Sequence, residues 1–233
     1  LLFLKIICKW KSVNKPIKLK GTNVHSMKNL NPVKKMEIMC IYRSKEGREV
    51  EFNLLTDGSD TMDYEDLEVP NFVSMMGGFS VTMDGYKTIF RGVNFNHLWK
   101  PVSFLLESLF WLEGLSSGLL DIDGEFSSSL ILSTMIEEKF VLSKSRENGL
   151  NLSFLAPYEA PMKTRAQHYF SEVPLPLKDW KEAVYVALEE YFYCAEQVLH
   201  LNPNGNNAGV LNELIDLWKK IVGIVQLELK NKE

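Results

Sequence analysis

The residues of this chain best suited to chemistry are acidic side chains near its middle. Asp121, Asp123 and Glu125 alternate along the sequence, so an extended backbone would place their three carboxylates on one face. Glu137 and Lys139 follow about one hairpin later. Clustered carboxylate oxygens suit a hard cation such as Mg²⁺, which lowers the pKa of its bound water. The pattern therefore supports one catalytic hypothesis, a magnesium-dependent nuclease that uses Asp123, Glu137 and Lys139.

This spacing resembles the D…E-x-K arrangement of restriction-endonuclease-like enzymes, in which two carboxylates hold magnesium and the lysine helps to activate water. A preceding helix could add Glu107 or Glu113. Chance explains the pattern equally well, because 21 Glu and 21 Lys in 233 residues predict about two E-x-K triplets, and two occur. The segment from Asp121 to Gly124 is also typical of a simple turn. We therefore keep the nuclease as the alternative hypothesis and favour a chain that is not an enzyme.

The histidines and cysteines predict neither a metal site nor a cofactor. No two of the four histidines have the i, i+4 spacing of metal ligands on a helix. Cys8, Cys40 and Cys194 are widely separated and form no C-x-x-C motif. The sequence also lacks a phosphate-binding glycine loop and a nucleophile motif. We expect no cofactor, no bound metal and a reduced, cytoplasmic environment.

The densest charge in the body of the chain lies between residues 56 and 70, which hold six acids and no base. The segment begins like a calcium loop, but Met62 stands where that motif needs glycine, and Ser59 and Thr61 replace carboxylates. Acidic surface speeds the encounter with a basic partner, although the same charge can serve solubility alone. On the first interpretation, the partner-binding residues are Asp57, Asp60, Asp63, Glu65, Asp66 and Glu68.

Charge divides the chain into a basic tail and an acidic body. Residues 1–35 hold nine of the 26 Lys and Arg and no acid, which leaves residues 36–233 with 17 basic and all 30 acidic residues, a net charge of −13. The tail could be an arm for nucleic acid or a membrane surface, a targeting peptide, or translated sequence upstream of the true start. We expect residues 1–35 to be disordered or foreign to the native protein. We expect no secretion signal, no membrane span and no nucleic-acid partner for the body.

Hydrophobic periodicity predicts the elements of one domain over residues 36–233. Residues 97–116 are predicted to form a helix that is apolar almost all round, and such a helix is buried. Alternating apolar residues predict hairpins at 37–55 and at 79–95, the second around Asp84-Gly85. Further strands are predicted within 126–136, at 138–143 and at 150–155, whereas the glycines at 77 and 78 indicate a turn.

The C-terminal third predicts a loop followed by two helices. Prolines between residues 157 and 176 break the chain into a connection. Apolar stripes then predict helices over about 177–201 and up to about 229, which a short link makes antiparallel neighbours. We therefore expect an α+β fold, with a mixed, mainly antiparallel sheet packed on a buried central helix and a C-terminal antiparallel helix pair.

The order of these elements resembles a family of small bacterial proteins. The pattern W-x(5)-L-L-x(2)-L from Trp99 to Leu109, strands with an E-x-x-L-like pattern, and a proline-led helix at Pro174-Leu175-Pro176-Leu177 with Trp180 look like toxin-immunity proteins, including the immunity partners of wall-associated contact-dependent toxins. The resemblance covers most of residues 36–201. It implies a cytosolic protein that binds and blocks a basic toxin, often a nuclease, and that has no catalytic residues of its own.

Overall fold

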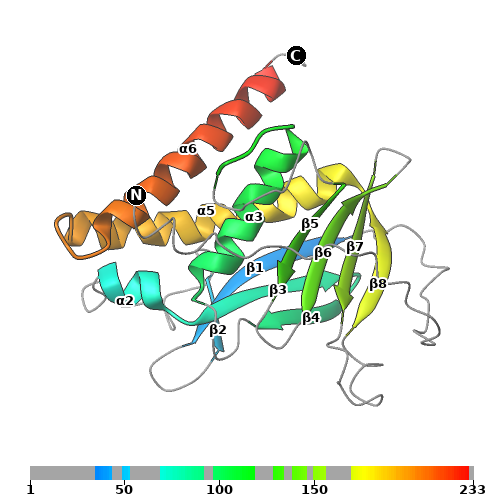
Figure 1. Cartoon of the computed structure of the whole chain (residues 1–233), viewed down its shortest axis with the longest axis horizontal. Helices are drawn as coiled ribbons and strands as arrows, with labels where there is room; N and C mark the ends of the chain where they lie inside the picture. The colour runs from blue at the N-terminus through cyan, green and yellow to red at the C-terminus, as the bar shows by residue number, and fades with distance from the viewer. Residues whose placement is uncertain are drawn as a thin grey trace.

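The computed structural model describes residues 35–43, 49–52, 69–91, 97–118, 128–133, 138–145, 149–155 and 169–230. In this part of the chain, helices and antiparallel strands form an α+β fold, which confirms the predicted class (Figure 1). The strands make two four-stranded sheets where we expected a single sheet. Periodicity identifies individual strands but carries no information about which distant strand each one pairs with.

The first sheet has the order β2-β1-β3-β4 and is antiparallel throughout. Asp84 and Gly85 have φ angles of 48° and 87°, so they form the tight turn that Asp-Gly favours between two strands. Because β1 pairs with β2 and β3 pairs with β4, both predicted hairpins are present. The strands are Met36–Arg43 (β1), Glu49–Glu51 (β2), Gly77–Met83 (β3) and Tyr86–Arg91 (β4).

Gly77 and Gly78 lie inside β3, so the predicted turn at these glycines is wrong. A Cβ atom at Gly77 would collide with the backbone carbonyl oxygen of Ile41 on β1. The glycine therefore allows a close approach of two strands, a role that glycine also has within sheets.

The second sheet has the order β5-β6-β7-β8 and is also antiparallel. Strand β8 corrects the predicted loop before Pro176. Pro174 lacks an N–H group, but β8 is the edge strand of its sheet, where that donor is not needed. The strands are Ser129–Ser133 (β5), Lys139–Lys144 (β6), Leu150–Leu155 (β7) and Phe170–Leu175 (β8).

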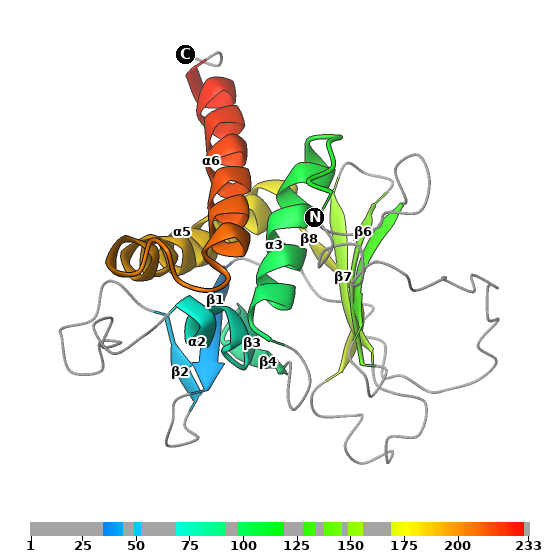
Figure 2. The ribbon, with the colours of Figure 1, turned by 60° about the vertical axis from the view of Figure 1, so that its left-hand side comes forward.

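Helix α3 (Trp99–Leu112) confirms the predicted buried helix, because every residue from Pro101 to Trp111 is buried. Figure 2 shows α3 between the two sheets. Phe104 of α3 stacks on Phe79 of β3, with ring centroids 6.3 Å apart, and meets Phe140 of β6 edge-on at 5.8 Å. One aromatic cluster therefore joins the helix to both sheets.

Helix α5 (Leu177–Leu201) packs along β1, and helix α6 (Ala208–Lys230) follows it, so the predicted C-terminal pair is confirmed. Trp218 of α6 contacts Tyr185 and Phe192 of α5, with centroids 5.1 and 5.3 Å apart. From the connecting turn the two helices diverge (Figures 1 and 2). The pattern did not predict the short helix α2 (Val69–Ser74), which contributes Phe72 to the core beside α5.

Candidate functional site

Most of the predicted site residues lie outside the described part of the chain. This holds for the six acids of the 56–70 segment and for Asp121, Asp123, Glu125 and Glu137. The structure does describe Lys139, which is exposed at the start of β6. Its neighbour Glu138 accepts a hydrogen bond from the Tyr169 hydroxyl at 2.5 Å. Burial, reinforced by this bond, raises the pKa of Tyr169.

Glu107, considered as an extra carboxylate for the nuclease hypothesis, is buried in α3 and bound to the turn that follows the helix. The backbone N–H of Ser117 donates to its two oxygens at 3.3 and 3.2 Å, and the Ser117 hydroxyl donates to Oε2. Burial raises the pKa of Glu107, while the hydrogen bonds from Ser117 and Ser116 partly oppose that rise. These contacts give Glu107 a structural role in holding the chain where it leaves α3.

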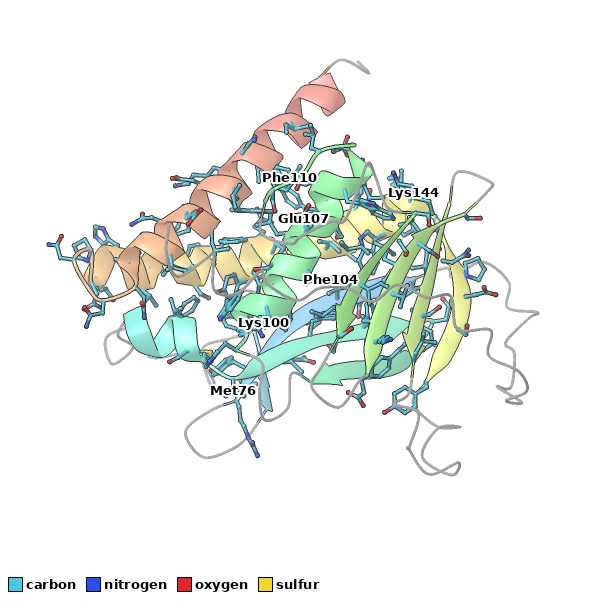
Figure 3. All side chains as sticks on the ribbon, in the orientation of Figure 1. Met76, Lys100, Phe104, Glu107, Phe110 and Lys144 are labelled. Atoms are coloured by element: carbon cyan, nitrogen blue, oxygen red, sulfur yellow. The ribbon has the colours of Figure 1, made fainter. Side chains whose placement is uncertain are left out.

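Glu113 lies at the end of α3, near one end of strand β6, whereas Lys139 begins that strand at its other end. Glu113 forms an ion pair with Lys181 of α5 just after the last turn of α3. Lys144, at the other end of β6 from Lys139, lies 4.7 Å from the ring centroid of Trp111 in that same turn (Figure 3). Because five residues of strand span about 17 Å, Lys139 lies far from the end of α3.

The described residues include no group of three or more His, Cys, Asp or Glu side chains that could hold a metal ion. They do include an open groove of about 710 Å³ between α5 and α6, close to the turn that joins the two helices. Its walls are mainly polar. The lining residues are Glu196, Gln197, Leu199, His200, Pro203, Asn212, Ile215, Asp216 and Lys219.

Charges on both walls define the electrostatics of this groove. Glu196 of α5 pairs with Lys219 of α6, Oε1 to Nζ, at 2.9 Å, and their side chains are 43% and 63% exposed. Asp216 is exposed one turn before Lys219. A cation that enters the groove can therefore reach the carboxylate of Asp216 directly. From there it can compete with Lys219 for the carboxylate of Glu196.

Two large apolar side chains stand beside the groove on the surface of α5. Tyr193 is 49% exposed and Leu201 is 50% exposed. Both lie four residues from the lining residue Gln197, and side chains at that spacing are neighbours on one helix face. No local sequence pattern predicted this groove; the available signal was Tyr193, an aromatic residue outside the apolar stripe of its helix.

Comparisons of the chain with models of protein families, with curated proteins and with solved structures found no match. Within the described ranges, none of the helices combines the length and apolar character needed to cross a membrane.

Proposed function

We propose that this chain is a non-catalytic module that binds a basic protein partner through its acidic surface. The net charge of −13 on residues 36–233 is the observation that carries the proposal. A potential of one sign accelerates encounter with a partner of the opposite sign and penalises partners of the same sign.

The contrast between buried and exposed polar groups in the described residues supports this proposal. The buried hydroxyl of Ser108 donates to the Leu105 carbonyl oxygen at 2.6 Å and accepts from Nε1 of Trp180 at 3.1 Å. Like Glu107, it is occupied by contacts within the fold. Glu182 and Glu189, by contrast, are exposed on α5, where carboxylates are accessible to another molecule.

The resemblance of most of residues 36–201 to immunity proteins suggests the class of partner. On this proposal the partner is a basic toxin that the chain neutralises by covering its active surface. The acids of the 56–70 segment are the first contact, because they form the densest charge in the body of the chain.

A pull-down from the source cell tests the proposal. We expect a stoichiometric basic protein that is retained at low salt and lost at high salt, because ions screen charges at the rim of an interface. Neutralising the six acids to Asn and Gln should weaken binding and flatten its dependence on salt. Unchanged affinity would remove this segment from the binding site.

A charge-matched pair of variants separates a specific contact from a general loss of charge. The first changes Asp57, Asp60 and Asp63 to Asn, and the second changes the exposed Glu172, Glu182 and Glu213 to Gln. We expect the first to weaken binding more than the second. Magnesium-dependent cleavage of nucleic acid by the purified chain, lost in Glu137→Ala, would contradict the proposal and support the alternative hypothesis.

A further inference from the structure

The α5–α6 groove combines charged walls with two apolar side chains beside it. Glu196 and Asp216 supply two carboxylates, while Tyr193 and Leu201 stand about half exposed on the α5 side. Interfaces between proteins favour an aromatic or aliphatic anchor surrounded by a polar rim, and tyrosine is among the residues that contribute most. This composition suits an extended segment of protein that carries both cationic and apolar side chains.

Lys219 is an ion-pair partner of Glu196 that an incoming cation can replace. Its ammonium neutralises Glu196 across the groove, yet its side chain is 63% exposed and it lies at the end of a flexible stem. An arriving arginine can bind the carboxylate of Glu196 with two parallel hydrogen bonds, which an ammonium cannot do. Lys219 can then turn toward solvent without leaving a buried charge unpaired.

We propose that this groove, formed by Glu196, Asp216 and Lys219 and flanked by Tyr193 and Leu201, binds an arginine-containing, partly apolar segment of a protein partner. The proposal rests on the proposed function, to which it adds a second contact surface and the chemistry of the segment bound there. The net charge of −13 on residues 36–233 favours the approach of such a segment over an acidic one.

Two short synthetic peptides test the proposal with the full chain. One alternates arginine with leucine, and in the other glutamate replaces every arginine. We expect fluorescence anisotropy to show binding of the arginine peptide, weakening as salt rises, and no binding of the glutamate peptide. The double variant Glu196→Gln with Asp216→Asn should weaken binding about twofold to thirtyfold, the range expected for two exposed charge pairs, and Tyr193→Ala should weaken it as well.

Lys219→Gln gives the sharpest result, because it removes the intramolecular competitor and should strengthen binding of the arginine peptide. Its control is Lys178→Gln, since Lys178 also pairs with a glutamate, Glu182, on α5 but does not line the groove. The control for the double variant is Glu182→Gln with Glu213→Gln, which removes the same charge outside the groove. Circular dichroism checks that each of these surface variants is folded.

Equal effects of the groove variants and their controls would overturn the proposal, because binding would then reflect net charge alone. Failure of the arginine peptide to bind would also overturn it. If the pull-down returns a basic partner that the groove variants still bind, the groove proposal fails and the proposed function stands. If the peptide binds through the groove but the pull-down returns no partner, the proposed function fails.

Discussion

At the scale of single residues, Glu107 shows how the fold uses a charge in its interior. It lies in the most buried helix and its carboxylate binds the turn at Ser116 and Ser117. From the sequence alone, Glu107 was considered only as an additional carboxylate for the nuclease hypothesis. Its partners are nine and ten residues away and are brought to it by the chain reversal after α3, which no local pattern encodes.

The raised pKa of Glu107 predicts how stability depends on pH. Because burial raises its folded-state pKa above the ordinary value of 4.5, this group contributes stability that is full below that value and is lost as pH rises through the folded-state pKa. We therefore expect the free energy of unfolding of the native chain, relative to that of Glu107→Gln, to fall as pH rises. Urea unfolding at pH values from 4 to 8 measures this difference.

Val102→Ala is the control for this series, since it also alters a buried side chain of α3 but removes no titrating group. Its effect on the free energy of unfolding should stay constant with pH. A Glu107→Gln difference that is equally constant would show that the carboxyl does not change its proton affinity on folding.

At the scale of elements, the sequence predicted those turns and helices that depend on interactions between residues close together in the chain. The Asp84-Gly85 turn, the apolar helix α3 and the stripes of α5 and α6 each depend on residues close together in sequence. Strand β8 was missed because it contains Pro174, and proline usually interrupts a strand. The strand tolerates this proline only because β8 lies at the edge of its sheet. The α5–α6 groove was missed because it depends on how two helices diverge, which their separate patterns do not specify.

Two glycines give opposite predictions for the same substitution. Gly77→Ala should destabilise the fold, because the new methyl group meets the Ile41 carbonyl oxygen of the neighbouring strand. Gly223→Ala should stabilise α6 by about 0.5–1 kcal/mol, because the new Cβ would meet nothing within 4 Å beyond the adjacent residues and the backbone of its own helix, and alanine is the better helix former.

Thermal unfolding of the two glycine variants, monitored by circular dichroism, measures both effects. The prediction requires the melting temperature to fall for Gly77→Ala and to rise for Gly223→Ala. A rise for Gly77→Ala would mean that β1 and β3 separate more easily than their close approach implies.

At the scale of the whole molecule, α3 joins two sheets that are each built from neighbouring segments. The first sheet uses strands between residues 36 and 91, and the second uses strands between residues 129 and 175. Phe104 contacts both through Phe79 and Phe140. The stability of the whole domain therefore depends strongly on this ring.

Phe104→Ala should lower the free energy of unfolding by about 3–5 kcal/mol, the usual cost of deleting a fully buried ring. Trp99→Ala is the matched control, because Trp99 begins the same helix but is only partly buried, and its cost should be smaller. Urea denaturation measures both. A larger loss for Trp99→Ala would contradict the bridging role of Phe104.

The burial of α3 also has a consequence for synthesis on the ribosome. The helix ends at Leu112, but α5, which packs against it, ends only at Leu201. At about 5–20 residues per second, the intervening chain takes on the order of 4–18 s to make. During this interval the nascent chain carries an apolar helix that still lacks its later covering elements. A molecular chaperone that binds apolar helices could bind the uncovered α3 during this interval. Packing of the newly made α5 against α3 would then end that binding.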